Sequence, residues 1–324
     1  MKKIYIKFVD FAKDFDPLNN DFLCILKKHF NVCFSDSPEY LFYSCFGNEH
    51  LKYDCIRIFY TGECIVPDFN ICDYAIGFDE ISFGDRYLRV PLYALFQYKK
   101  AYETGKRKHK TNMEISTKKF CNFVCSNCDS KSLREQLFIK LSEYKRVDSG
   151  GRYKNNVGGP VKDKLEFQKK YKFSIAFENC SYKGYTTEKI VQAFAAGTIP
   201  IYWGDPDIDK YFNPKSFINA NNLSIDEIIE QVKKIDESDD LYKEMLFEPM
   251  QLPNQIIDYE SAIENFFLNI FTSDLTKAVR RPIGNFAQSY EDEIKLSSQF
   301  VSPIYRMMKR IKYHLLKIKK SILG

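Results

Sequence analysis

The chain has 324 residues, of which 44% are hydrophobic and 28% are charged. That length and apolar content accommodate two domains with sizeable cores and exclude an intrinsically disordered chain. The formal net charge is +5, but residues 295–324 hold eight basic side chains and no acidic one. The rest of the chain is slightly acidic, which excludes a nucleic-acid groove through the body of the protein.

The first residues, MKKIYIKFVDF, alternate apolar side chains with lysines and lack the long apolar stretch of a signal peptide. No segment of the chain is long and apolar enough to span a bilayer. We therefore expect a cytoplasmic protein whose 10 cysteines are reduced thiols.

Residues 1–100 alternate short apolar runs with polar turns. We expect strands at KIYIKFV (3–9), CIRIFY (55–60) and CDYAIGF (72–78), and a helix at DFLCILKKHF (21–30). This alternation of strands and helices predicts a mostly parallel sheet covered by helices.

The segment 102–114 is the best candidate for a linker, because it holds almost no apolar residue. After it the alternation restarts. We expect strands at 118–127, 171–179 and 198–204, and helices at 132–145, from 188 onward and at 224–235. The sequence therefore predicts an α/β protein with two Rossmann-like domains, residues 1–108 and 109–285, that face a cleft. Ligands of such sheets bind beyond the carboxyl ends of the strands.

Residues 286–324 are expected to form a basic tail. On a helical wheel, the apolar side chains of residues 300–324 form one stripe: Ile304, Met307, Met308, Ile311, Leu315, Ile318 and Ile322. Basic residues flank this stripe, as is typical of a helix that lies on an anionic membrane surface. We therefore expect a protein peripheral to the inner face of the membrane. The alternative is a terminal helix that packs on the protein and exposes a solvated lysine face.

Two of the helices expected after the linker carry a basic residue in their first turn. Ser132 and the glutamate three residues later fit a capping box, which places Arg134 in the first turn of that helix. Thr187 is placed to cap the next helix, with Glu188 and Lys189 in its first turn. Helix N-termini already favour anions, so an added arginine and lysine predict a diphosphate between them. The alternative is that both side chains are merely solvated.

The phosphate-binding loops of common nucleotide enzymes are missing. The sequence has no G-x-x-x-x-G-K-[ST] and no G-x-G-x-x-G after a strand, which argues against P-loop and nicotinamide enzymes. The glycine-rich segment VDSGGRYKNNVGGP (147–160) follows another pattern. We expect it to be a loop at the cleft; the alternative is a mobile surface loop.

Two patterns resemble metal sites. Asp205-Pro206-Asp207 can hold a divalent ion, but an aspartate before a proline also caps and starts a helix, which we favour. Cys121, Cys125 and Cys128 have the spacing of the iron–sulfur loop of radical-SAM enzymes. They lie within and just beyond an apolar strand, which disfavours a cluster. We predict no metal site.

The segment FENCSYKGYTTEKIVQAFAAGTIPIYWGDPDIDKYFNPKSFIN (177–219) resembles the signature of the alpha-1,3-fucosyltransferases, especially the bacterial ones. The segment DFNICDYAIGFDEISFGDRYLRVPLY (68–93) resembles the motif of their N-terminal domain. The similarity is long and ordered and covers roughly residues 55–260, far more than a short motif matches by chance.

The resemblance implies a GT-B fold and a transfer of L-fucose from GDP-beta-L-fucose, with inversion. The acceptor implied is the 3-hydroxyl of N-acetylglucosamine in an N-acetyllactosamine-type glycan, which gives Lewis-type antigens on lipid-linked glycans such as lipopolysaccharide. The donor would bind the C-terminal domain and the acceptor mainly the N-terminal one. No cofactor is required for this chemistry, although stimulation by a divalent ion is compatible with it.

The resemblance also implies roles for six residues by matching position. Glu80 corresponds to the catalytic base, Arg134 and Lys189 to the diphosphate ligands, and Glu188 to a ligand of the GDP ribose. Asn179 and Tyr185 would line the phosphate and fucose region. These roles suit an inverting transfer, which needs a carboxylate to take the acceptor proton and positive charge around the leaving diphosphate. The residues alone do not favour Glu80 over Asp79.

The sequence departs from some relatives. Some of them carry heptad repeats before a basic tail and the animal enzymes carry an N-terminal membrane anchor; neither is found here. Two alternatives stay open. One is a GT-B glycosyltransferase with another nucleotide-sugar donor, and the other is a non-catalytic, membrane-associated glycan-binding protein.

Overall fold

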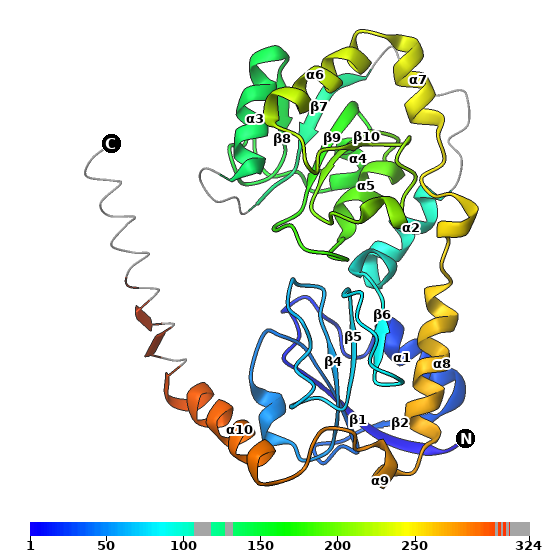
Figure 1. Cartoon of the computed structure of the whole chain (residues 1–324), viewed down its shortest axis with the longest axis vertical. Helices are drawn as coiled ribbons and strands as arrows, with labels where there is room; N and C mark the ends of the chain where they lie inside the picture. The colour runs from blue at the N-terminus through cyan, green and yellow to red at the C-terminus, as the bar shows by residue number, and fades with distance from the viewer. Residues whose placement is uncertain (107–117, 127–131, 302–303, 306, 309–310, 312–324) are drawn as a thin grey trace. The chain divides into compact units, whose positions relative to one another are not determined.

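The structure is a computed structural model, and it describes residues 1–106, 118–126, 132–301, 304–305, 307–308 and 311 (Figure 1). The chain forms two compact units. The first comprises residues 1–76, 83–88 and 263 onward, and the second comprises residues 77–82 and 89–262. Each unit is built on a sheet of parallel strands, so the predicted α/β class with two Rossmann-like domains is confirmed.

The sheet of the first unit has the strand order β2-β1-β3-β4-β5-β6, and each pairing from β2 to β5 is parallel. The strands are β1 (Lys3–Val9), β2 (Asn31–Phe34), β3 (Tyr40–Tyr43), β4 (Ile56–Tyr60), β5 (Tyr74–Gly77) and β6 (Tyr87–Arg89). Helix α1 (Asp21–His29) follows β1, and a short 3-10 helix, η1 (Glu49–Lys52), follows β3. The side chain of Asn20 accepts the backbone N–H of Leu23 at 2.9 Å, which fixes where α1 begins.

The expected strands at 3–9, 55–60 and 72–78 and the expected helix at 21–30 are confirmed by β1, β4, β5 and α1. Strands β2, β3 and β6 were not predicted. They are only three or four residues long, so their sequences are too short to display the two-residue period of a strand.

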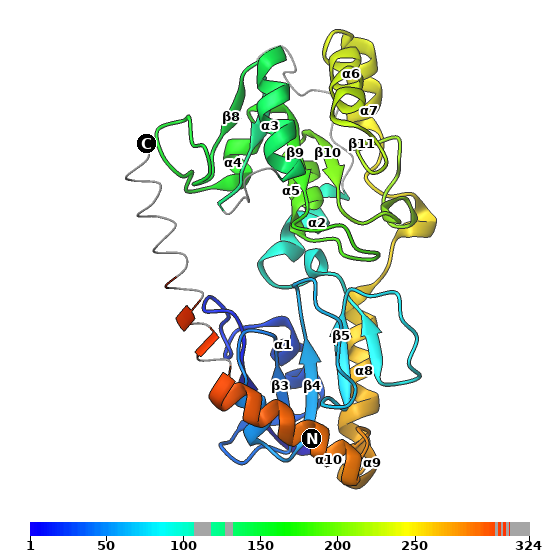
Figure 2. The same ribbon diagram turned by 60° about the vertical axis from the view of Figure 1, so that its left-hand side comes forward.

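From residue 263 onward, the C-terminal helices belong to the first unit. They are α8 (Tyr259–Thr272), α9 (Leu275–Ala278) and α10 (Asn285–Leu296), followed by a π-helical turn, η7 (Ser297–Val301). Figures 1 and 2 show α8, in yellow-orange, alongside the blue sheet. The ring of Phe271 lies 4.3 Å from the ring of Tyr40, and the ring of Phe267 lies 5.8 Å from that of Phe22. Burying these aromatic rings brings residues 263–285 to the first unit, whereas the sequence analysis assigned them to the second domain.

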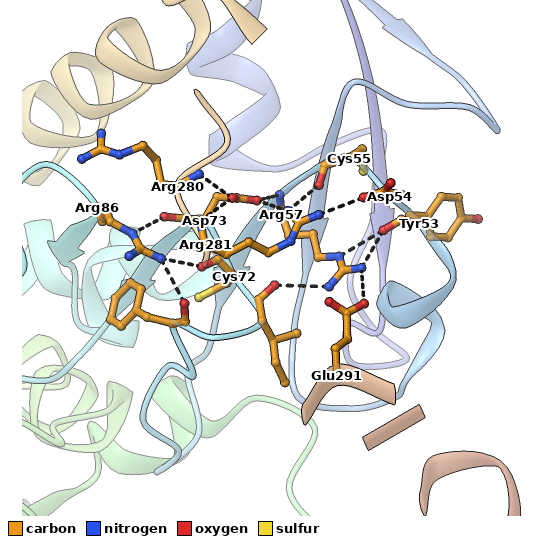
Figure 3. Close-up of polar contacts among 12 residues, drawn as sticks. Tyr53, Asp54, Cys55, Arg57, Cys72, Asp73, Arg86, Arg280, Arg281 and Glu291 are labelled. Carbon is orange, nitrogen blue, oxygen red and sulfur yellow. Dashed lines mark hydrogen bonds and ion pairs between the residues drawn. The ribbon is translucent and has the colours of Figure 1, made fainter. Parts of the chain in front are cut away.

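A buried network of charges joins the same C-terminal segment to the sheet (Figure 3). The fully buried Asp73 accepts the backbone N–H groups of Arg280 and Arg281 through Oδ1, at 2.7 and 2.9 Å. Its Oδ2 accepts a hydrogen bond from the backbone N–H of Arg57 at 2.8 Å and another from the guanidinium of Arg281 at 2.5 Å. Arg57 donates in turn to Glu291 of α10 at 2.8 Å. Each of these buried charges therefore has its partner within the same unit.

The sheet of the second unit has the order β11-β10-β9-β7-β8, with all pairings parallel. Its strands are β7 (Lys119–Phe123), β8 (Val147–Ser149), β9 (Tyr171–Phe177), β10 (Ile199–Trp203) and β11 (Ile218–Asn219). Its helices are α2 (Lys99–Gly105), α3 (Leu133–Tyr144), α4 (Lys164–Gln168), α5 (Glu188–Ala195), α6 (Ile225–Asp236) and α7 (Asp239–Phe247). The described part of the unit also has the 3-10 turns η2 (Leu92–Ala94), η3 (Phe96–Tyr98), η5 (Ile208–Lys210) and η6 (Pro253–Gln255).

Helices cover both faces of this second sheet. Leu137 of α3, Ile228 of α6 and Tyr242 of α7 share one apolar core with alternate residues of the strands. On the other face α5 packs against α2. A β-carbon on Gly105, at the end of α2, would lie 3.3 Å from the β-carbon of Phe194 in α5 and 2.8 Å from the sulfur of Met250, so a larger residue there would push these neighbours away. The three layers can be followed in Figures 1 and 2.

The strands and helices expected after the linker are confirmed by β7, β9, β10, α3, α5 and α6. The structure also has a capping box at the start of α6, between Ser224 and Glu227. The linker predicted at 102–114 is wrong for its first residues. Residues 102–105 complete α2, where Tyr102 is buried against Tyr93 and Tyr259, so its aromatic ring belongs to a core rather than to a linker. Residues 107–114 lie outside the described residues.

The apolar stripe predicted for residues 300–324 lies partly outside the described residues, since Leu315, Ile318 and Ile322 are not described. Of its members, Ile304, Met307, Met308 and Ile311 are described and exposed. In the described part of the chain, no helix combines the length and the apolarity that a membrane crossing requires.

Replacing Asp73 by alanine should lower the free energy of unfolding by about 3–5 kcal/mol, because the buried Arg281 guanidinium and three backbone N–H groups lose their acceptor. Asp85→Ala is the matched control. It removes the exposed partner of Arg280 and should cost about 0–1 kcal/mol. Urea denaturation followed by far-UV circular dichroism measures both, and equal losses would contradict the structural role of Asp73.

Candidate active site

The second sheet reverses its strand order at one point. Counted from β7, its order is 2-1-3-4-5, so the topological switch point lies between β7 and β9. Arg134, in the first turn of α3, donates through Nη1 to Oδ1 of Asn179 at 3.0 Å, just beyond the end of β9. Two of the predicted donor-binding residues therefore meet at the place where ligands of such sheets bind.

The other predicted cation, Lys189, already has a buried partner. Its ammonium donates to Oε2 of Glu178 at 2.9 Å and to the hydroxyl of Thr187 at 2.8 Å. Glu178 follows β9 and is fully buried. Burial alone would lower the pKa of Lys189, but the charges of Glu178 and Glu188 outweigh it and hold that pKa above its usual range. Lys189 is therefore a fixed, protonated cation.

The two helix starts differ from each other. Ser132 caps α3 as predicted, since its hydroxyl accepts the N–H of Glu135 at 3.3 Å. Thr187 occupies the N-cap position of α5, but its hydroxyl makes no capping bond there. That hydroxyl donates to Glu178 at 2.7 Å, and the Thr187 N–H donates to the same carboxylate at 2.7 Å. The predicted threonine cap is wrong because the buried Glu178 engages the threonine instead.

Glu188 opens α5 and lies between two lysines. Its Oε1 is 3.8 Å from the ammonium of Lys189 and 3.9 Å from that of Lys164, the first residue of α4. Burial opposes ionisation of Glu188, but the two lysines more than compensate, and its pKa lies below the usual value. Glu188 is therefore ionised and able to accept hydrogen bonds from a ribose.

Tyr185 is buried in the same loop. Its ring meets that of Phe78 edge-on, with the centroids 5.1 Å apart. Gly184 beside it has φ = +78°, and a β-carbon there would lie 2.5 Å from the carbonyl oxygen of Phe78. Only glycine fits this close approach, which brings residues 77–82 against the loop that follows β9.

Glu80 lies in this segment and belongs to the second unit. Its Oε1 accepts the hydroxyl of Tyr211 at 2.6 Å, and its Oε2 accepts the ammonium of Lys210 at 2.9 Å. Burial would raise the pKa of Glu80, but these two hydrogen bonds outweigh it and lower the pKa below the usual value. Arg89 stacks on Tyr211, 3.9 Å from the ring centroid. Asp79, by contrast, is buried, and burial raises its pKa.

The aspartates of the predicted metal pattern are engaged by the chain itself. Asp205 accepts the N–H groups of Gly184 and Asp207, both at 2.9 Å, and the hydroxyl of Thr186 at 3.1 Å. It therefore stabilises the turn before η5 and ties it to the loop after β9. Asp207 pairs with Lys210 at 2.9 Å.

Two of the three cysteines with iron–sulfur spacing lie in the described part of the chain. Cys121 and Cys125 are buried and form no disulfide, and Cys128 lies outside the described residues. Among the described residues, no group of three or more histidine, cysteine, aspartate or glutamate side chains is arranged to hold a metal ion.

The glycine-rich segment 147–160 begins as β8 and continues as a loop held by its own asparagines. Asn156 accepts the N–H of Ser149 at 2.7 Å, and Asn155 accepts the N–H of Gly159 at 2.8 Å. A β-carbon on Gly151 would lie 1.9 Å from the carbonyl oxygen of Cys125, so the loop packs directly on the segment that leaves β7.

Comparison with known protein families gives two matches, and each of them contains one of the two sequence motifs. Residues 6–96 match the N-terminal domain of alpha-(1,3)-fucosyltransferase FucT, and residues 96–248 match the C-terminal part of glycosyltransferase family 10 (fucosyltransferase). The chain belongs to the glycosyltransferase family 10 fucosyltransferases. The predicted resemblance is confirmed.

Individual relatives agree with this family. The chain is 37% identical over 262 residues to the alpha-(1,3)-fucosyltransferase FucT of Helicobacter pylori, which covers 69% of this chain and 55% of that protein. It is 30% identical over 232 residues to a putative fucosyltransferase of Acanthamoeba polyphaga mimivirus, covering 67% of this chain and 37% of that protein. The chain thus spans about half or less of the length of these curated relatives.

Solved structures establish the fold. A crystal structure of an alpha1,3-fucosyltransferase with GDP-fucose is 32% identical, with a TM-score of 0.71 over 85% of this chain and 92% of that one. HepE of Anabaena, with UDP and glucose bound, is only 7% identical, with a TM-score of 0.51 over 84% of this chain and 100% of that one. The predicted GT-B fold is confirmed.

The predicted site residues are distributed over the two parts of the chain that match family models. Glu80 lies in the part matched by the N-terminal model, and Arg134, Asn179, Tyr185, Glu188 and Lys189 lie in the part matched by the C-terminal model. The structure brings Arg134 to Asn179 and Glu188 to Lys189, and it places Glu80 in the same compact unit as all of them. Their roles stay predictions.

Four further residues were not predicted: Glu178, Lys164, Lys210 and Tyr211. For Glu178 a signal was present, since an acidic residue directly after the apolar strand 171–177 stands at the carboxyl end of a parallel strand. Lys164 and Lys210 stand in polar stretches where many lysines are simply solvated, so the sequence gives no reason to single them out.

Replacing Lys210 by methionine should raise the pKa of Glu80, because the variant loses the ammonium that stabilises the ionised carboxylate. A 13C NMR titration of the Glu80 carboxyl, assigned by the loss of its signal in Glu80→Gln, measures the change. Lys215→Met, at an exposed lysine on the same stretch, should leave the titration where it is. An unaltered Glu80 titration in Lys210→Met would show that this ion pair does not set its ionisation.

Proposed function

We propose that this chain is an inverting alpha-1,3-fucosyltransferase that moves L-fucose from GDP-beta-L-fucose to the 3-hydroxyl of N-acetylglucosamine in N-acetyllactosamine-type glycans. The observation that carries the proposal is the contact of Arg134 with Asn179 at the switch point of the second sheet, in a chain of this family. The relative crystallised with GDP-fucose supports the choice of donor for that protein, and we extend it to this chain.

The chemistry assigns each charged group a task. The acceptor hydroxyl attacks C1 of fucose, the bond from C1 to the diphosphate oxygen breaks, and GDP leaves with the bonding electrons. Glu80 takes the proton of the attacking hydroxyl, for which it must be ionised, as its lowered pKa favours. Arg134 and Lys189 bind the diphosphate and stabilise the charge that grows on it. Glu188 accepts hydrogen bonds from the ribose, and Asn179 and Tyr185 line the phosphate and fucose region.

The setting of the reaction follows from the same proposal. The product is a Lewis x type structure on a lipid-linked glycan, made at the cytoplasmic face of the inner membrane. We propose that turnover requires no cofactor, with a divalent ion as a stimulant at most, because the positive charge comes from side chains and helix N-termini.

The full-length chain should release GDP from GDP-fucose in the presence of N-acetyllactosamine, and much less from GDP-mannose or UDP-sugars. Glu80→Gln should lower kcat by about 10²–10⁴-fold, since a positioned general base contributes that much. The matched control is Glu230→Gln, which changes an exposed carboxylate paired with Lys233 on the surface. Full activity in Glu80→Gln, or faster turnover with another nucleotide sugar, would refute the proposed chemistry or the proposed donor.

We also propose that residues 300–324 associate with an anionic membrane surface. Seven of the eight basic side chains of residues 295–324 fall in this segment. The apolar residues described in this segment are exposed, for example Met308 by 60% and Ile304 by 57%. Apolar insertion and the attraction of basic side chains, about 1 kcal/mol for each lysine or arginine near the surface, act together in such helices.

Truncation after residue 300 should leave GDP release intact and lower co-sedimentation with vesicles that contain phosphatidylserine. The full chain should pellet less with neutral vesicles and less at high salt, because salt screens the attraction. Equal pelleting of the full and truncated chains with the anionic vesicles would refute this role of the tail.

A further inference from the structure

Lys189 lies in the first turn of a helix, where it could bind a diphosphate, but the carboxylates around it weaken its attraction for an anion. Its ammonium is already paired with the buried Glu178 at 2.9 Å, and Glu188 lies 3.8 Å away. A cation neutralised by its own carboxylate attracts a second anion weakly. The two carboxylates together offset two of the three cations gathered here, which are Arg134, Lys164 and Lys189.

Lys164 is paired more weakly than Lys189. Its side chain is 27% exposed, and its nearest carboxylate, that of Glu188, lies 3.9 Å away, beyond hydrogen-bond distance. Within the described part of the chain, no hydrogen-bond acceptor is found for its ammonium. A mostly buried ammonium without a hydrogen-bonded partner is costly, and a bound anion would relieve that cost.

The surroundings of Lys164 explain its electrostatics. Burial and the nearby Lys189 lower the pKa of Lys164, while Glu188, Glu178 and the thiol of Cys125 act in the opposite direction with less effect. A ligand that brought negative charge would strengthen the protonated form. Perturbed titratable groups of this kind cluster at functional sites.

We propose that Lys164 is a third cation of the donor site and binds the phosphate nearest the ribose of a nucleoside diphosphate. The assignment rests on the proposed function. The choice of phosphate follows from the neighbour of Lys164, because Glu188 is the residue to which we assign the ribose. Arg134 and Lys189 then bind the rest of the diphosphate.

Lys164→Gln should weaken the binding of GDP and of GMP by about tenfold or more, and leave guanosine binding unchanged, because only the phosphate loses a charged partner. Isothermal titration calorimetry with GDP, GMP and guanosine on the full-length protein measures this. Lys169→Gln is the matched control, since that lysine lies just after the same short helix but pairs with Glu166 on the surface. Its affinities should equal those of the wild type.

A second measurement separates a binding role from a merely structural one. At alkaline pH the wild type should take up protons when GDP binds, because the diphosphate raises the lowered pKa of Lys164. Lys164→Gln should take up fewer. Calorimetry in buffers of different ionisation enthalpy gives the number of protons, and circular dichroism verifies that the variant is folded.

The outcomes distinguish the two levels of the proposal. If Arg134→Ala and Lys189→Ala weaken GDP binding while Lys164→Gln does not, the role of Lys164 is wrong and the donor site stands. If all three variants retain the affinity of the wild type, the donor site itself is wrongly placed. Equal losses of guanosine and GDP affinity in Lys164→Gln would also overturn the proposal, since they would indicate a general distortion of the site.

Discussion

One buried ion pair organises the carboxyl edge of the second sheet. The carboxylate of Glu178, at the end of β9, accepts the backbone N–H and the hydroxyl of Thr187 and the ammonium of Lys189. Because α5 begins at Glu188, these contacts fix the first turn of the helix to the strand. They also fix Asn179, the next residue along the chain, where it meets Arg134. The remaining features of the candidate site are arranged around this pair.

The first sheet shows that topology alone does not make such a site. It begins with the same order, β2-β1-β3-β4-β5, so it too has a switch point, between β1 and β3. There Asp10 follows β1 and accepts the N–H groups of Glu49 and His50, both at 2.9 Å, and the ring of His50 at 2.7 Å. The charge at this edge is used to hold a turn of the chain. Function therefore depends on which side chains a fold places at the edge.

Much of this organisation could be predicted from the sequence, and the exceptions have physical causes. Long elements with clear periodicity, such as α3 and α6, were predicted within a few residues, and Arg134 and Lys189 could be singled out by their place in a first turn. Glu80 required the family resemblance, because a carboxylate after a strand is common. Glu178 and Lys164 escaped prediction, since their importance lies in a balance of charges between segments that only the folded chain brings together.

The return of the C-terminal helices to the first sheet bears on how the chain folds as it is made. Arg57 is buried in a strand that leaves the ribosome early, but Glu291, its partner, is 234 residues further along. At roughly 5–20 residues per second, synthesis of that stretch takes on the order of 10–50 s. The second unit, built from residues 77–82 and 89–262, needs no later segment. The amino-terminal sheet is therefore begun first and completed last, and for tens of seconds it carries an unneutralised guanidinium and the uncovered rings of Phe22 and Tyr40, the kind of nascent surface that chaperones bind.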